Sequence, residues 1–329
     1  MKQKMCDYIS SQQSPSIFKP YERKYKRIMY SRMLLEDFSS WFSSEFTPIE
    51  LRSGINRNKF YQVIPEDDEL NKLIRFNHTR DFDYNFDELL KKIMYYLLVN
   101  GRTYAEIVSL TDQNNVVRGI ELICVPAKHP RKIRNTYAFS AKNNKGEQIH
   151  FYISRPQLII FDLKDLGFDR NYFRRQFARL SKYELTDAQK LMLHPRMQKI
   201  FDFTEYTKTM DLRFLKDTLP IHWLGRKYDN EHLSESYLLY RKMKYKMLRY
   251  KFLQYILHQI NTQLEYFKTE WKFEGHITTL ASVSPYEDAF SQYQRGQLNT
   301  SQLGDILIKN RTMAEVKSQE QLDDTPLAT

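Results

Sequence analysis

The pattern of hydrophobic and polar residues is clearest between Asn85 and Val125. Apolar side chains recur there at helical spacing, at Phe86, Leu89, Leu90, Ile93, Met94, Leu97 and Leu98. Asn85 is a residue type that caps helices, and Glu88 stands at capping-box spacing from it. Asn100-Gly101 then offers residues that readily take the left-handed conformation of a helix stop. We therefore expect one helix that begins at Asn85 and stops at Gly101.

Two strands are expected after this helix. Residues 103–110 predict the first strand, 111–115 a polar turn, and 116–125 a second strand that ends before Pro126. The odd-numbered and even-numbered positions of 103–110 differ too little in polarity to show which face is buried. Helix, stop and hairpin together predict one compact unit.

A second hairpin is predicted farther along the chain. Residues 136–140 and 147–153 flank Asn143-Asn144-Lys145-Gly146, which is a strong turn sequence. The apolar residues 158–161 then predict a short strand.

Helices are expected in most of the rest. A short aromatic helix is predicted from Leu34 to Phe46, with Pro48 ending it, and residues 162–228 are expected to be helical and irregular. Near the C-terminus, Ser284-Pro285-Tyr286-Glu287 has the form of a capping box, and Gly296 closes that helix. Another short helix is expected to start at Asn299 or Thr300. The polar residues 315–329 are expected to be disordered.

The longest predicted helix covers residues 229 to about 268. Asp229 or Asn230 can cap it, and neither Gly nor Pro interrupts it. At 1.5 Å per residue it would reach ~55 Å. A helix of that length exceeds the usual size of a globular element, which suggests a structural strut or a contact in an oligomer.

These elements predict an α+β fold: a small core of helix and β-hairpin, a long helix and a mostly helical C-terminal half. The expected segments are a basic and aromatic N-terminal arm (1–60), the α+β core (60–160), a helical irregular region (161–228), the long helix with a C-terminal helix pair (229–314) and a disordered tail (315–329).

Basic side chains gather in two helical regions. The first half of the long helix has six cations with no acid among them: Arg241, Lys242, Lys244, Lys246, Arg249 and Lys251. Such a run destabilises an isolated helix through like-charge pairs at i,i+4, and a nearby polyanion would relieve the repulsion. Three more cations, Arg174, Arg175 and Arg179, lie between the aromatic residues of 168–183. They form either a solvated helix face or contacts to phosphates or to an acidic neighbouring subunit.

The overall charge agrees with an acidic partner. The formal net charge is +11 and the sequence pI is about 9.3, which favours a partner such as nucleic acid. The 44 Tyr and Phe residues predict core and subunit contacts, with base stacking as the alternative. No apolar run spans a bilayer, the first seven residues have no signal-peptide core, and two cysteines make no disulfide framework. We expect an intracellular, reducing setting and no membrane.

The histidines, glycines and acids of the chain form no strong catalytic motif. The sequence has no His-x-His, no His-Glu-x-x-His and no phosphate-binding glycine loop. Asp162, Asp165 and Asp169 could hold Mg²⁺ for phosphodiester hydrolysis, and Glu270-Trp271-Lys272 has a nuclease-like spacing. Both features are common by chance, and Cys124 fits a buried structural thiol. We therefore expect a protein that is not an enzyme, with no catalytic residues, metal or cofactor.

Two parts of the chain resemble one protein family. The segment LLVNGRTYAEIVSLTDQNNVVRGIELICVPAKHPRKI resembles the wing region of tailed-bacteriophage portal proteins, the head-tail connectors. The matching residues are Leu97, Leu98, Gly101, Tyr104, Ala105, Glu106, Ile107, Gly119, Leu122 and Pro126. The long helix and the helix pair around Gly296, Leu298 and Thr300 are similar to the C-terminal part of portals.

This resemblance implies a structural function. The chain would form a homo-oligomeric ring, a dodecamer by resemblance, at one vertex of a phage capsid. Double-stranded DNA of any sequence would pass through during packaging and ejection. Capsid, terminase and head-tail adaptor proteins would dock on the ring, in the virion and in the host cytoplasm during assembly. The α+β core would be wing, the long helix stem or wing, and the helix pair would lie near the channel or crown.

Two alternatives stay open. One is a nucleic-acid-binding protein of a phage or mobile element that forms no ring and uses the same basic residues for phosphate contacts. The other is the Mg²⁺-dependent nuclease that the carboxylates suggest.

Overall fold

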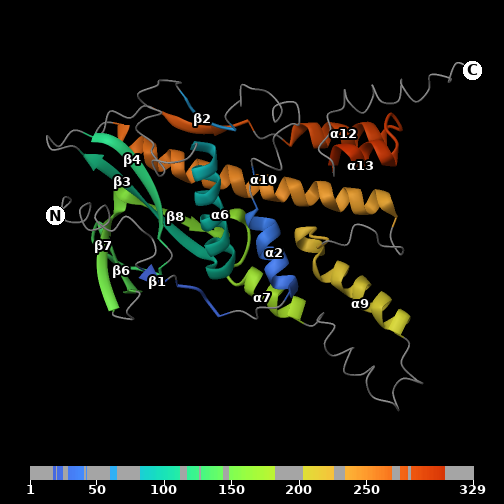
Figure 1. Ribbon diagram of the computed structural model, residues 1–329, viewed down its shortest axis with the longest axis horizontal. Helices are drawn as coiled ribbons and strands as arrows, with labels where there is room; N and C mark the ends of the chain where they lie inside the picture. The colour runs from blue at the N-terminus through green and yellow to red at the C-terminus, as the bar shows by residue number, and fades with distance from the viewer. Residues whose placement is uncertain are drawn as a thin grey trace, which may run out of the picture.

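The computed structural model describes most of the predicted elements. Its described residues are 18–19, 21–24, 29–40, 42, 60–64, 82–111, 117–125, 127–143, 148–181, 203–225, 234–268, 275–280 and 283–307. Small antiparallel sheets lie at one end of this part of the molecule, and the longest helix runs from them to the other end (Figure 1).

The predicted unit of helix, stop and hairpin is present. Helix α6 (Phe82–Asn100) is followed by Gly101, whose φ is +76°, and then by β3 (Arg102–Thr111) and β4 (Val117–Val125). The helix begins earlier than predicted, so Asn85 lies inside it and is not its cap. In its first turn, the Asp83 carboxylate accepts the N–H groups of Phe60 and Tyr61.

Strand β3 is the middle strand of a three-stranded antiparallel sheet of order β4-β3-β8, with β8 formed by Leu158–Asp162. Its Ala105 and Ile107 belong to the large core beneath α6, whereas Tyr104 belongs to a second, smaller core. Because both faces of β3 are buried, its sequence shows no alternation of polar and apolar residues.

The smaller core lies between this sheet and a second one. The second sheet contains β1 (Phe18–Lys19), β5 (Arg131–Ile133), β6 (Thr136–Asn143) and β7 (Gln148–Ser154), so the predicted second hairpin is confirmed. Phe139 and Phe151 stack at 5.3 Å and pack with Tyr104 and Leu158 of the first sheet. The 3₁₀ helix η2 (Arg155–Gln157) connects the two sheets.

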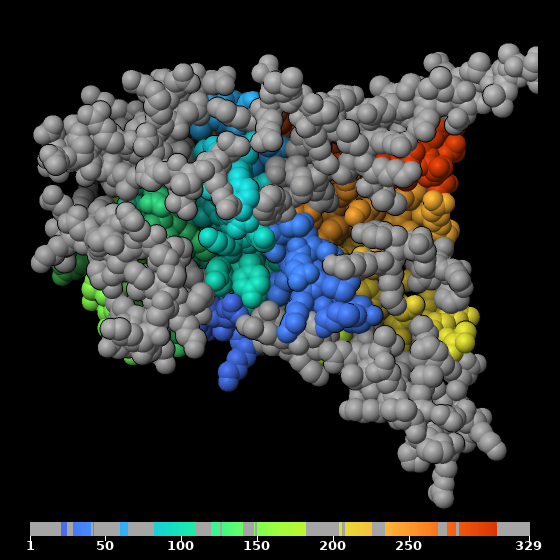
Figure 2. Space-filling model, viewed as in Figure 1, coloured from blue at the N-terminus to red at the C-terminus, as the bar shows by residue number. Residues whose placement is uncertain are grey.

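The long helix is α10 (Glu235–Tyr266), which is ~48 Å long at 1.5 Å per residue. It starts after Ser234, later than predicted. Its apolar side chains join one large core with α6, α2 (Met29–Ser39), α7 (Tyr172–Leu180) and α9 (Phe203–Asp217). Helix α2 thus begins earlier than the predicted Leu34, and it lies beside α6 (Figure 2).

A short sheet joins distant parts of the chain. Strand β2 (Tyr61–Ile64) pairs antiparallel with β9 (His276–Thr279), and neither strand was predicted. The Tyr61 hydroxyl donates to Asp87 of α6 over 2.6 Å, so β2 is bound to the helix as well as to β9.

Two short helices follow β9 and pack against α10. Helix α12 (Ser284–Gln294) starts with Ser284 as its first residue, and no side chain caps it, so the predicted capping box is wrong. Gly296 closes it with a φ of +72°, as predicted. Asn299 caps α13 (Thr300–Leu307), since its side chain accepts the Gln302 N–H while Gln302 accepts the Asn299 N–H.

The predicted α+β class is confirmed. In the described part of the chain, no helix has both the length and the apolar character required to cross a bilayer. The predicted disordered tail lies outside the described residues.

Candidate functional site

The predicted cations of α7 lie on the surface. Arg174, Arg175 and Arg179 are exposed, while Phe173 and Phe177 of the same helix are buried. Arg175 contacts Asp169 at 3.3 Å, but both side chains are more than half exposed. An exposed pair of this kind contributes little stability, so these arginines remain available to a partner.

Arg241 of α10 has a different environment. Its side chain is fully buried, and its guanidinium donates to the carbonyl oxygens of Leu215 and Trp223 and to the Thr218 hydroxyl, at 2.9–3.1 Å. Burial lowers the pKa of Arg241. The residue joins α10 to the turn after α9, and the sequence-based prediction of a DNA or subunit contact does not fit a side chain inside the protein.

Arg249 and Lys246 are also inside. Arg249 donates to the Ser40 carbonyl over 2.8 Å and lies 4.8 Å from the Phe42 ring centre, and burial lowers its pKa to about 9. The Lys246 ammonium lies 4.4 Å from the centre of the Tyr286 ring. Both side chains are 2% exposed. Carbonyl oxygens, aromatic rings and, for Arg249, the nearby Asp37 carboxylate therefore stabilise these cations inside the protein.

The other three cations of α10 reach the surface to different degrees. Lys251 is exposed and lies 3.4 Å from the Leu166 carbonyl oxygen, whereas Lys242 and Lys244 are half-buried. The predicted basic run on α10 is therefore divided between core and surface, and only Lys242, Lys244 and Lys251 can face a partner.

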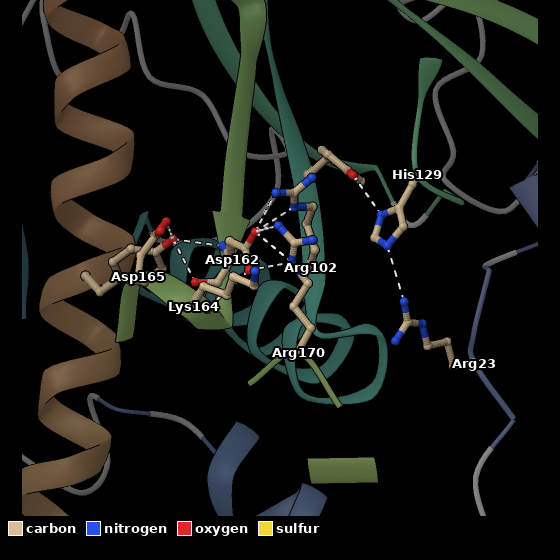
Figure 3. Close-up of polar contacts among 9 residues, drawn as sticks. Arg23, Arg102, His129, Asp162, Lys164, Asp165 and Arg170 are labelled. Carbon is tan, nitrogen blue, oxygen red and sulfur yellow. Dashed lines mark hydrogen bonds and ion pairs between the residues drawn. The ribbon is translucent and has the colours of Figure 1, made fainter. Parts of the chain in front are cut away.

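The Asp162 carboxylate at the end of β8 is the centre of a cluster of hydrogen bonds (Figure 3). It accepts hydrogen bonds from Arg102 of β3, from Arg170 and from the Lys164 N–H. Partial burial raises the pKa of Asp162, but these hydrogen bonds outweigh it and lower the pKa to about 2. The side chains of Arg102 and Arg170 are about 30% exposed.

Gly101 sets the distance between α6 and this cluster. A Cβ on Gly101 would lie 2.0 Å from the Arg170 carbonyl oxygen, and the Gly101 carbonyl accepts the Leu163 N–H over 3.1 Å. The backbone of the turn before α7 therefore contacts Gly101 directly. Only glycine gives both the positive φ and this close approach.

The N-terminal segment is attached to the same region. Arg23 donates from its backbone to the Asn100 side chain and from its guanidinium to Asn171, over 2.9 and 2.8 Å. Its guanidinium also lies 3.3 Å from His129 Nε2, while Tyr104 Oη lies 3.0 Å from His129 Nδ1 (Figure 3). Desolvation and the nearby guanidinium groups lower the pKa of His129.

The carboxylates proposed for metal binding are used otherwise. Asp162 binds two arginines, Asp165 accepts the Tyr255 hydroxyl over 2.8 Å, and Asp169 contacts Arg175. Among the described residues, no group of three or more His, Cys, Asp or Glu side chains is placed to hold a metal ion. Glu270-Trp271-Lys272 lies outside those residues.

Two buried acidic groups have no evident part in a site. Cys124 is buried, as predicted, and burial raises its pKa to about 12. Glu106 of β3 is 2% exposed, its Oε2 has no hydrogen-bond donor among the described residues, and burial raises its pKa to about 8. Both groups are protonated at neutral pH.

The chain matches no protein-family model and no curated protein.

Sequence reasoning missed a group of exposed cations on the second sheet. Lys128, Arg131, Lys132 and Arg134 are all exposed, in β5, in the loop before it and in the turn after it. A signal for them was present: between Glu121 and Asp162 the sequence has seven Lys and Arg residues and one acid, Glu147. This small fraction of the chain supplies more than half of the net charge of +11.

Proposed function

We propose that this chain is a portal-like structural subunit that forms a homo-oligomeric ring at a phage capsid vertex. The observation that carries the proposal is the order of elements. Helix α6, the Gly101 stop and the β3–β4 hairpin come first, then α10, and then the pair α12 and α13 joined at Gly296. This is the order in which the sequence resembles portal proteins.

The contacts inside the chain are those of a scaffold. Asp162 joins β3, β8 and the turn before α7, and Arg23 adds the N-terminal segment to α6. Arg241 and Arg249 bind α10 to the backbone carbonyl oxygens of Leu215 and Ser40. The hydrogen bonds of these groups connect elements within the chain and stabilise the fold. A rigid fold of this kind suits a subunit that bears load in an assembly.

A ring needs two different faces on each subunit, because its contacts are heterologous. The double-stranded DNA would be bound without sequence preference, through phosphate contacts. Capsid, terminase and head-tail adaptor proteins are the other proposed partners, by resemblance, with a dodecamer as the expected ring. The proposed locations of the protein are the virion and, during assembly, the host cytoplasm.

The mass of the purified native protein tests the proposal. A closed ring would have a multiple of the 39.8 kDa subunit mass, twelvefold for a dodecamer, by native mass spectrometry or light scattering. A single species of 39.8 kDa at micromolar and higher concentration would overturn the ring.

One observation favours a second function, a nucleic-acid-binding protein that forms no ring. The exposed cations of α7 and of the second sheet would serve phosphate contacts in a monomer equally well. The same mass measurement separates the two functions, because DNA binding by a species of 39.8 kDa would support the second.

A further inference from the structure

We propose that the β5 region carries the surface that binds the phosphate backbone of double-stranded DNA. We call this surface the hairpin patch and define it as Lys128, Arg131, Lys132 and Arg134. The inference rests on the proposed function for its partner, DNA, but it does not require a ring. It also moves the expected DNA contact away from α10, where three of the six predicted cations are buried.

The charge of the hairpin patch has a single sign. In the described residues of the second sheet and of the loop before it, 127–143 and 148–154, no side chain is acidic. On α9, by contrast, Glu205, Asp211 and Asp217 alternate with the basic residues. A patch without carboxylates has an uncompensated positive potential that attracts a polyanion.

The strand register presents the cations on both sides of one edge strand. Strand β5 pairs only with β6, among the described strands. Arg131 stands opposite Ala138, while Lys132 stands opposite Tyr137, so the two side chains leave opposite faces of the sheet. Both are nevertheless exposed, since the strand lies at the edge. The edge of this four-stranded sheet therefore presents cations that can contact the phosphates of a duplex.

Arg134 has a left-handed backbone conformation, which glycine and asparagine adopt more readily than arginine. It has a φ of +51° in the two-residue turn between Ile133 and Thr136, a place that glycine or asparagine adopts without strain. Arginine here costs free energy and makes no hydrogen bond among the described residues. A strained residue at an exposed tip suggests that its side chain is needed for binding.

The patch continues into the N-terminal segment. His129, next to Lys128, lies beside the Arg23 guanidinium, and Lys24 follows as an exposed cation. The described residues 21–24 hold two cations and one acid, Glu22, so this segment adds a net charge of +1 beside β5.

The surroundings favour duplex DNA over other acidic partners. A protein interface would have an apolar centre, yet among the side chains of this sheet that the structure describes, Ile133 is the one exposed aliphatic residue. Single-stranded nucleic acid would need several exposed aromatic rings for stacking, and Tyr152 is the one large exposed aromatic residue among those described side chains. Charged edge strands also protect against aggregation, so the test must separate that role from binding.

The test measures DNA affinity against salt concentration for the full chain and a duplex of about 40 base pairs with arbitrary sequence. The variant Arg131→Gln/Lys132→Gln/Arg134→Gln removes three charges from the patch. If the three contact phosphates, the slope of log K against log salt becomes shallower by about 2.7, and affinity near 0.1 M salt falls on the order of 10- to 100-fold. The control variant Lys208→Gln/Arg213→Gln/Lys216→Gln removes three exposed charges from α9 and should change neither value.

Each outcome decides one point. Equal slopes for the patch variant and the wild type would overturn the inference, leaving the cations as protection of a sheet edge. Loss of the native oligomer in the patch variant, with DNA binding retained, would make the patch a subunit contact and also overturn it. A monomeric wild type whose DNA binding depends on the patch would overturn the ring and support the inference.

The single variant Arg134→Asn gives a second readout that a fold defect cannot imitate. Asparagine removes one charge and relieves the backbone strain, so the melting temperature should rise while the salt slope falls by about 0.9. A higher melting temperature with unchanged binding would contradict a role for Arg134 in binding.

Discussion

Replacing Gly101 by alanine is expected to destabilise the protein much more than the same change at Gly167. Both glycines have a positive φ, +76° and +85°. A Cβ on Gly167 meets nothing within 4 Å, whereas a Cβ on Gly101 would lie 2.0 Å from the Arg170 carbonyl oxygen. The two variants therefore share the backbone strain and differ in the clash.

The magnitudes follow from these two terms. A left-handed alanine costs about 1–2 kcal/mol, and the loss of glycine's freedom in the unfolded chain returns roughly 0.4–1 kcal/mol. Gly167→Ala should thus cost about 1 kcal/mol. At Gly101 the turn before α7 must also move away from α6, which disturbs the Arg170–Asp162 contact and adds about 1–3 kcal/mol. We expect about 3 kcal/mol in total for Gly101→Ala.

Urea unfolding followed by circular dichroism measures both variants. The midpoint should fall for Gly101→Ala with little change in the slope of the free energy against urea. If Gly101→Ala costs no more than Gly167→Ala, the contact with Arg170 does not constrain the fold and the reasoning fails.

Three further predictions concern buried groups. Glu106→Gln should stabilise the protein by about 3 kcal/mol at pH 7, because burial raises the pKa of Glu106 from 4.5 to about 8. The unfolded state loses its proton first, so wild-type stability should fall as the pH rises from 4.5 to 8, and urea midpoints for the variant should not show that fall. Arg241→Met should cost about 3 kcal/mol, since three buried oxygen acceptors lose their donor, while unchanged thermal stability would contradict this. In a Cys6→Ser background, Cys124 should react with a thiol reagent only after unfolding, and rapid native labelling would refute its burial.

Sequence patterns located the elements whose signals are local. The spacing of apolar residues in α6, the Gly101 stop and the following hairpin all lie within about 40 residues, and they appear in the structure in that order. The start of α6 could not be read in this way. There Asp83 binds the backbone of Phe60 and Tyr61, a contact between segments more than 20 residues apart that no local pattern shows.

The sequence pattern also could not predict that three cations of α10 are buried. A basic run usually marks a solvated face, and Lys251 fits that rule. Arg241 does not, because α10 is packed on several sides and the turn after α9 directs carbonyl oxygens at its guanidinium. The charges alone do not show which acceptors the tertiary fold will provide.

The hairpin patch shows the opposite case. Its cations lie in a stretch of the sequence with almost no acids. Hairpin strands are expected to have a buried face, so this pattern did not show that all of these cations are exposed. The register at the sheet edge determines that Arg131 and Lys132 are both exposed.

The pairing of β2 with β9 has a consequence for the synthesis of the chain. Gln62 and Thr278 are 216 residues apart, yet their strands lie side by side. At 5–20 residues per second, β2 leaves the ribosome roughly 10–40 s before its partner exists. During that interval its unpaired backbone is open to other nascent chains on the same message. An unpaired strand edge favours aggregation, so crowded translation is a stage at which this protein is prone to aggregate.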